Sequence, residues 1–241
     1  MNLPLLLFIA FGSAAVATIT GFGAAIILTP FLSLLIDLKS AIVLVAIFHI
    51  AIAIVRIILL RKGVVWKILF LYGIPSLLTA GVASWIFKFL HVTSLTWGVA
   101  IFLILFALYS LFVPNLRVPE KDSLLVLGGL IGGFVSGLIG MAGGIRSAFL
   151  VSTELKKESF IATSTAIALA TDVIRILIYY FGGSMKDLSL PLIPSLLFVG
   201  ILGTFAGKWL LGRLNEDMAQ KAVLFALLLL GIKMIYDLVS K

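Results

Sequence analysis

The sequence predicts an all-α integral membrane protein built from two inverted repeats of five helical segments each. Of its 241 residues, 62% are hydrophobic and only 12% are charged, whereas soluble domains are about half apolar and about a quarter charged. No segment alternates with period two, which disfavours a β-barrel. Backbone groups in lipid must form hydrogen bonds within their own segment, so the segments are expected to be helices.

The repeat becomes visible when the sequence is compared with itself at one fixed offset. Arg56 and Arg175 differ by 119 positions (175 − 56), and the same offset relates Gly63 to Gly182. It also relates residues 74–78 to residues 193–197, both of which read Ile-Pro-Ser-Leu-Leu. Chance matching among Leu, Ile and Ala does not produce paired Arg, Pro and Gly in one register. We therefore expect an internal duplication, which is typical of helical transporters.

Each repeat contains five apolar segments. In the first repeat they cover residues 3–19, 24–36, 40–60, 64–90 and 94–113, and in the second 123–139, 145–154, 159–181, 188–211 and 216–239. We expect one membrane unit over residues 1–113, a polar, proline-bearing linker over 114–122, and a second membrane unit over 123–241. The first segment lacks a basic leading region, so we interpret it as part of the mature fold.

The first two segments of each repeat are short and are joined by a Gly-rich turn. Segment 24–36, with about 13 residues, would reach only about 20 Å, against a hydrocarbon core of about 30 Å. We expect a helical hairpin or broken helix with its turn inside the membrane; the alternative is two thin spans with the turn at the surface. Three further spans give each repeat an odd number of crossings, so the repeats should be inverted.

The net charge of +8 predicts the orientation, because Lys and Arg concentrate in cytoplasmic loops. The side of the membrane with more basic residues contains Arg61, Lys62, Lys67, Arg117, Lys121, Lys156, Lys157, Lys208 and Arg213. The poorer side collects Lys39, Lys88, Lys186 and Lys241. The linker is therefore expected inside the cell and both termini outside it, in a multi-pass protein of the plasma membrane.

Several functional classes are disfavoured. The basic residues are scattered and form no run, which argues against nucleic-acid binding. There is no cysteine, which excludes thiolate metal sites and cysteine nucleophiles. Nucleotide-binding loops, HExxH motifs and clustered acid–base residues are also missing, so neither an enzyme nor a cofactor is expected.

The strongest candidate site is the turn at residues 140–144 followed by Arg146. A helix that starts there presents unpaired amides and the positive end of its dipole, which suits an anion. Arg146 adds a charged donor fork for oxyanions. The alternative is that the glycines allow close helix packing and that Arg146 extends to a headgroup. The first-repeat copy has no arginine, so binding there would use amides or threonines. Its candidate residues are Gly21, Gly23, Ala24, Thr18, Thr20 and Thr29, and those of the second copy are Gly140, Gly143 and Gly144.

Further polar residues interrupt the two helices that follow these turns. Asp172 precedes Arg175 by three residues and can pair with it on one helix face. His49 lies on the same face as Arg56 and could relay a proton or be hydrogen-bonded structurally. Thr163, Ser164 and Thr165 could line a polar pore or bond back to their own helix. Tyr179, Tyr180 and the four tryptophans are expected at the membrane interfaces.

These motifs together resemble the sulfite exporter TauE/SafE family of membrane permeases. The resemblance rests on Gly21-Phe22-Gly23 with Thr29-Pro30-Phe31-Leu32, and on residues 137–144 with Ala162-Thr163-Ser164. It covers both repeats. The chain departs from the family pattern at Ala24 and Ala25, where a glycine run is common, and at residues 147–149, where a proline is common.

The resemblance implies a secondary carrier that moves sulfite, sulfonates or related sulfur-containing anions across the inner membrane. We expect the anion between the two turns, with Arg146 or Arg175 supplying charge. The expected partners are the anion and the lipid bilayer, with a proton as coupling ion and a homodimer left open. The alternatives are a carrier of another small anion, such as a carboxylate, and a membrane scaffold protein without transport.

Overall fold

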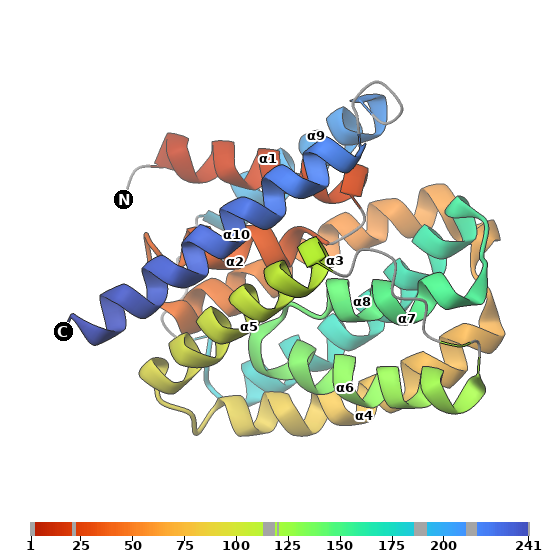
Figure 1. Cartoon of the computed structure of the whole chain (residues 1–241), viewed down its shortest axis with the longest axis horizontal. Coiled ribbons are helices and arrows are strands. Elements are labelled where there is room, and N and C mark those ends of the chain that lie inside the picture. The colour runs from red at the N-terminus through yellow and green to blue at the C-terminus, as the bar shows by residue number, and fades with distance from the viewer. Residues whose placement is uncertain are drawn as a thin grey trace.

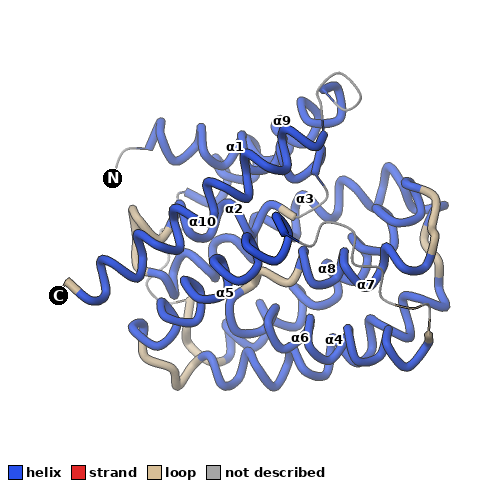
Figure 2. Tube along the Cα trace, in the orientation of Figure 1, coloured by secondary structure: helices blue, strands red, loops and turns tan. Residues whose placement is uncertain are grey.

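The computed structural model describes residues 3–20, 23–112, 119, 121–185, 192–210 and 216–240, and this part of the chain is helical without strands (Figures 1 and 2). An all-α fold is therefore confirmed. The first five helices are α1 (Leu3–Thr20), α2 (Ala24–Leu32), α3 (Leu38–Leu60), α4 (Trp66–Phe87) and α5 (Val92–Phe112). The next five are α6 (Asp122–Ile139), α7 (Gly143–Leu150), α8 (Lys157–Phe181), α9 (Leu192–Leu210) and α10 (Glu216–Val239).

The two halves of the chain pack in matching ways. The bounds of α1, shifted by 119 positions, coincide with those of α6. α1 packs against α9 as α6 packs against α4, and α3 packs against α9 as α8 packs against α4. α3 contacts α8, and α5 contacts α10. In Figure 1, α1 runs from left to right and α6 from right to left, and α3 and α8 are likewise opposed. Most residues of the linker at 114–122 lie outside the described residues, and Asp122 already begins α6.

Seven of the described helices are long and apolar enough to cross a membrane: α3, α4, α5, α6, α8, α9 and α10. The expectation that the first segment of each repeat is too short was wrong for α6. Both α6 and α1 have 18 residues, and 18 residues rise about 27 Å, close to the thickness of the hydrocarbon core. In the first repeat, α1 is not among the seven candidate spans and α2 has 9 residues; in the second repeat, only α7, with 8 residues, is short.

Glycines bring α6 and α1 into backbone contact with their neighbours. A Cβ built on Gly133 of α6 would lie 2.1 Å from the carbonyl oxygen of Ser76 in α4. A Cβ on Gly207 of α9 would lie 2.4 Å from the carbonyl oxygen of Ala15 in α1. Such close approach is how membrane helices associate where no hydrophobic effect drives them together. It holds α1 and α6, whose C-terminal ends lead into the Gly-rich turns, firmly against the rest of the bundle.

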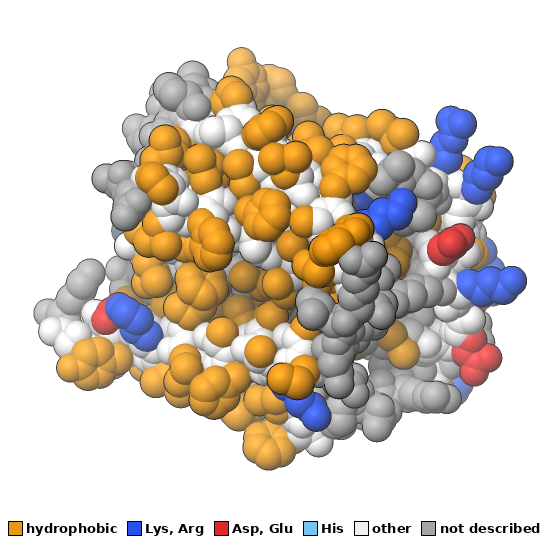
Figure 3. All heavy atoms as spheres, turned by 90° about the horizontal axis from the view of Figure 1, so that it is seen from above, with side chains coloured by type: hydrophobic (Ala, Val, Ile, Leu, Met, Phe, Trp, Pro, Cys, Tyr) orange, Lys and Arg blue, Asp and Glu red, His pale blue; other side chains and the backbone are white. Residues whose placement is uncertain are grey.

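The outer surface is that of a membrane protein. Hydrophobic side chains cover the middle of the molecule in Figure 3, and charged side chains gather chiefly at its right-hand end. Trp66, Trp85 and Trp209 are exposed, which agrees with their expected place at the interfaces. Tyr179 is a correction, because it is only 1% exposed and is hydrogen-bonded inside the bundle, as described below.

Candidate functional site

The two Gly-rich turns lie next to each other inside the bundle. Gly23 precedes α2 with φ 89°, and Gly140 follows α6 with φ 77°, conformations that favour glycine. A Cβ built on Gly23 would lie 3.9 Å from the Cα of Gly143 and 3.9 Å from Nε2 of His49. The start of α2, the start of α7 and the middle of α3 therefore converge. Gly21 lies outside the described residues.

Two small cavities open at this point of convergence. The first, here called the Asp172 cavity, is lined by Gly23, Ala25, Ile26, His49, Ser136, Gly140, Ala142, Gly143, Arg146, Ala168, Thr171 and Asp172. The second, here called the Arg56 cavity, is lined by Gly23, His49, Ile52, Ala53, Arg56, Arg146, Ser164, Thr165 and Ala168. The space open to the centre of a water molecule is about 10 Å³ in the first and about 20 Å³ in the second. Each has room for about one water molecule.

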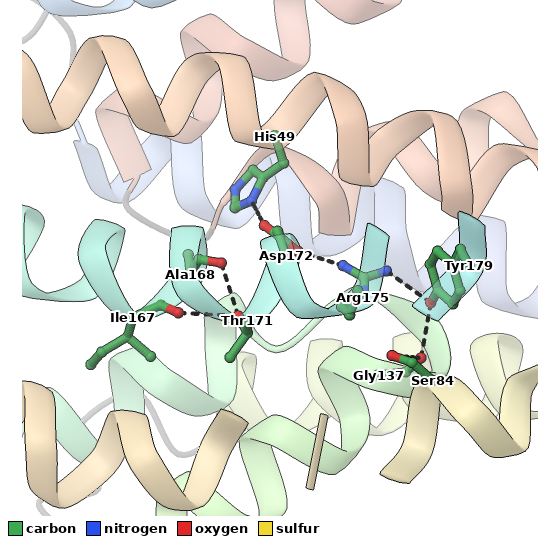
Figure 4. Close-up of polar contacts among 9 residues, drawn as sticks. All are labelled: His49, Ser84, Gly137, Ile167, Ala168, Thr171, Asp172, Arg175 and Tyr179. Carbon is green, nitrogen blue, oxygen red and sulfur yellow. Dashed lines mark hydrogen bonds and ion pairs between the residues drawn. The ribbon is translucent and has the colours of Figure 1, made fainter. Parts of the chain in front are cut away.

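A chain of polar contacts runs through α8 beside the Asp172 cavity (Figure 4). His49 points from α3 onto Asp172, with 2.6 Å between Nδ1 and Oδ2. The other carboxylate oxygen accepts a hydrogen bond from Nη1 of Arg175 at 2.5 Å, so the expected pair between Asp172 and Arg175 is present. Nη2 of Arg175 donates to the Tyr179 hydroxyl at 3.4 Å, which donates to the carbonyl of Gly137 at 2.9 Å.

This series of polar contacts neutralises one buried arginine. Arg175 is 2% exposed and Asp172 is 3% exposed. A buried guanidinium needs a nearby anion because water cannot solvate it there. Arg175 lines neither cavity, although a Cβ on Gly140 would lie 2.8 Å from its Nη2. Its charge is therefore already committed to Asp172, and it ties α8 to α3 and α6.

Arg146 is placed differently. It is 7% exposed, lies in the first turns of α7 and lines both cavities. Its Nε donates to the Ser164 hydroxyl at 2.8 Å. No carboxylate among the described residues forms an ion pair with it. The guanidinium thus faces the cavities with a neutral hydrogen-bond partner, and it does not extend to a headgroup.

Arg56, the repeat equivalent of Arg175, resembles Arg146 in having a hydroxyl as its described partner. Its Nη2 donates to the Thr18 hydroxyl at 2.7 Å, and that hydroxyl in turn donates to the carbonyl of Ala14 at 2.8 Å. Its Nε is buried without a hydrogen-bond partner among the described residues. Arg56 lines the Arg56 cavity together with Arg146. Within the described part of the chain, it too has no carboxylate partner.

Other candidate residues take structural places. The Thr163 hydroxyl accepts a hydrogen bond from the backbone amide of Val65 at 2.9 Å and lines neither cavity. A Cβ on Gly144 would lie 2.0 Å from the Phe106 ring, so this glycine allows α7 to pack on α5. Ala24 and Thr29 are buried and also line neither cavity.

The structure adds Thr171 and Ser136, which were not singled out from the sequence and line the Asp172 cavity. Of the three hydroxyls that could line a pore, Ser164 and Thr165 line the Arg56 cavity. Ser136 lies one helical turn before Gly140, and Tyr179 lies one turn after Arg175, so a helical-face comparison with these two residues would have found both. Thr171 adjoins Asp172, whereas nothing local distinguishes Thr165 from Thr163.

The arrangement suits a small anion. Three arginines and one aspartate surround the convergence of α2, α3, α7 and α8, and only one of the arginines is paired with the aspartate. Among the described residues, no group of three His, Asp or Glu side chains could hold a metal ion. The uncompensated groups are donors, and they lie beside glycine amides at the starts of two helices, where anions bind well.

Comparison with known proteins agrees with this chemistry. The family model described as "Sulfite exporter TauE/SafE" matches residues 6–234, nearly the whole chain. A search of curated proteins and a search of solved structures returned no match. The matched region includes both turns, the helices α3, α7 and α8, six of the seven candidate membrane spans in full, and the seventh, Met218–Val239, as far as residue 234. The chain therefore belongs to the sulfite exporter TauE/SafE family, a family of membrane transporters rather than enzymes.

Proposed function

We propose that this protein is a secondary transporter of a small sulfur-containing oxyanion, such as sulfite or an organosulfonate, and that the anion binds where the two Gly-rich turns converge. The observation that carries this proposal is the Arg56 cavity. Two arginines, Arg56 and Arg146, line it without a carboxylate partner among the described residues. A small cavity inside a membrane protein is a poor place for two cations without a carboxylate partner unless an anion joins them.

The expected attraction is large enough to favour the binding of a small anion. At a separation of 4 Å, two unit charges attract by about 4 kcal/mol when the effective dielectric constant is 20. A guanidinium also presents its donors in a plane, which matches two oxygens of a sulfur oxyanion or a carboxylate. We propose that Gly23 and Gly143 complete the site by letting backbone amides approach the anion. Gly140 shapes the turn that leads to α7.

Transport requires the cavity to open. An oxyanion with four or more heavy atoms does not fit a space of about 20 Å³, which holds about one water molecule. We propose that the described structure is an occluded form and that one half of the protein moves against the other to expose the site alternately to each side. The matching contacts of the two halves and the opposed directions of α1 and α6 in Figure 1 support two inverted units, residues 1–113 and 123–241.

The orientation is also a proposal. The exposed basic residues Arg61, Lys62, Lys67 and Lys156 flank the loops that join α3 to α4 and α7 to α8. Because basic residues concentrate on the cytoplasmic side, we propose that these loops and the linker at 114–122 face the cytoplasm. Both termini then face outward.

The direct test of function is a ligand screen on detergent-solubilised protein. Sulfite, thiosulfate, taurine, methanesulfonate, acetate and succinate are compared for their effect on the thermal unfolding midpoint. A ligand that binds the folded state raises the midpoint, because at 100 times its Kd it adds about 2.7 kcal/mol to the free energy of unfolding. We expect the sulfur oxyanions to raise it and the carboxylates to leave it nearly unchanged. Selective stabilisation by a carboxylate would favour the alternative substrate class, and stabilisation by none of them would favour a scaffold.

We further propose that His49 couples proton movement to anion movement. His49 contacts Asp172 directly and lines both cavities, the first together with Arg146 and the second together with Arg146 and Arg56. Imidazole is the side chain whose ordinary titration falls nearest neutrality. A proton on His49 adds positive charge to the anion site, so proton and anion should favour each other's binding. The two would then move in the same direction.

This coupling predicts a specific phenotype for His49→Gln, which keeps a hydrogen-bonding side chain but cannot carry the proton. In proteoliposomes, an imposed pH gradient should accelerate sulfite flux by the wild type. The variant should retain sulfite exchange without a gradient and lose the acceleration. A variant whose flux responds to the gradient as the wild type does would rule out His49 as the coupling group. Loss of all exchange would instead assign His49 to anion binding.

A further inference from the structure

The two halves of the protein are chemically unequal at the equivalent positions of α3 and α8. At the repeat offset of 119, Arg56 corresponds to Arg175, while Ala53 corresponds to Asp172 (172 − 119). Each arginine therefore has a residue three positions earlier on its own helix face. In α8 that residue is a carboxylate that binds the arginine, and in α3 it is a methyl group.

The two cavities differ in the same way, in the residue that lies three positions before the arginine. Asp172 lines one cavity and Ala53 lines the other, in each case with His49, Ala168, Gly23 and Arg146. On the α8 side, the carboxylate fills the place beside Arg175 and contacts its Nη1. On the α3 side, Arg56 has only the Thr18 hydroxyl as a described partner. The Nε atoms of Arg56 and Arg175 are both buried without a described partner, so the two arginines differ in the carboxylate alone. The space of about 20 Å³ beside Ala53 and Arg56 is thus the counterpart of the space that Asp172 occupies.

We propose that the transported oxyanion binds beside Ala53, in the position relative to Arg56 that the Asp172 carboxylate takes relative to Arg175. This inference rests on the proposed function and specifies its binding residues. Two oxygens of the anion face Arg56, and the third faces Arg146, which lines the same cavity. Arg175 does not bind the anion, because its anionic partner is Asp172, a residue of the protein itself. Asp172 acts as a fixed anion in one half, and the substrate serves as an exchangeable anion in the other.

The proposal also predicts that a single anion binds. Both halves supply an arginine, but the duplication leaves only one of them open to an external ligand. The small residue at position 53 sets the size of the bound group, because any larger side chain would occupy the ligand's place. Anions with a compact, oxygen-rich head should therefore bind, and any tail must extend away from Arg56.

The test introduces the missing carboxylate. In Ala53→Asp, a built-in anion should pair with Arg56 as Asp172 pairs with Arg175. The matched control is Ala53→Asn, which has nearly the same shape without the charge. Sulfite affinity, measured by titration calorimetry on detergent-solubilised protein, should fall at least about 100-fold in both variants, because either side chain fills the space beside Arg56 that the anion would occupy. Without sulfite, Ala53→Asp should unfold at a higher temperature than Ala53→Asn, and sulfite should no longer raise that temperature.

Wild-type sulfite affinity in both variants would overturn the proposal, and so would equal unfolding temperatures of the two variants without sulfite. If Ala53→Asp does not fold, Arg56→Gln decides the question: a loss of at least about 30-fold in sulfite affinity supports the site, and wild-type affinity overturns it. Failure of the proposed function gives a different result, namely a wild type that binds no sulfur oxyanion. A wild type that binds sulfite, loses it in Arg146→Ala and keeps it in Ala53→Asp would leave the function standing and remove only the site beside Ala53.

Discussion

Replacing Arg146 by Ala is expected to weaken sulfite binding at least about 100-fold and to abolish measurable transport. A 100-fold loss corresponds to about 2.8 kcal/mol, which is within the range for removing one partner of a desolvated, hydrogen-bonded charge pair. Arg146 is the residue best placed for such a loss, because it is buried, lines both cavities and has a hydroxyl as its described partner. The measurements are the Kd from titration calorimetry and sulfite flux in proteoliposomes.

Two further variants separate charge from geometry. Arg146→Lys keeps the positive charge but loses the planar donor fork, so an intermediate loss of about tenfold is expected. Ser164→Ala removes only the hydroxyl that orients the guanidinium and should cost less than Arg146→Ala. If Arg146→Ala binds sulfite as tightly as the wild type while remaining folded, the anion lies elsewhere, and the proposal for the two turns loses its main cation.

How far the sequence predicts this molecule can be judged from individual residues. The all-helical fold follows from composition, and the ten helices follow from the apolar segments, because lipid leaves the backbone few alternatives. The pair between Asp172 and Arg175 follows from a spacing of three on one helix. The extent of α6 was predicted to within one residue, but its capacity to span the membrane was not, because 18 residues lie close to the spanning limit, where small differences in rise and tilt decide the outcome.

The features that the sequence does not predict depend on contacts between segments that are far apart along the chain. His49 and Asp172 are 123 residues apart in the sequence, so no local pattern identifies them as partners. Tyrosine is a residue type typical of membrane interfaces, yet the Tyr179 hydroxyl forms hydrogen bonds with Arg175 and Gly137 inside the bundle. Gly144 belongs to the turn motif by sequence, but its missing side chain makes room for the Phe106 ring of α5. Only the packing of α5, α6 and α8 distinguishes these structural roles from binding roles.

Asp172→Ala is expected to produce the largest loss of stability among the variants considered, about 3–5 kcal/mol, because it leaves the buried Arg175 without its carboxylate. His49 would lose the same partner, since both contacts are to Asp172. The free energy of unfolding in detergent, obtained by denaturant titration, measures this loss. The substitution also removes the anion that, in our interpretation, keeps external ligands away from Arg175.

The rescue experiment identifies the cause. If the loss comes from an unpaired buried charge, then Asp172→Ala combined with Arg175→Met should recover much of the stability, because apolar replacements of a buried pair are often neutral or stabilising. A double-mutant cycle with the two single variants then gives the coupling free energy directly. Sulfite offers a second form of rescue: in Asp172→Ala alone it should bind beside Arg175 and raise stability more than it does in the wild type. A double variant no more stable than Asp172→Ala would show that Asp172 acts mainly through His49 and α3, and Arg175 could then no longer be regarded as a charge neutralised by its own chain.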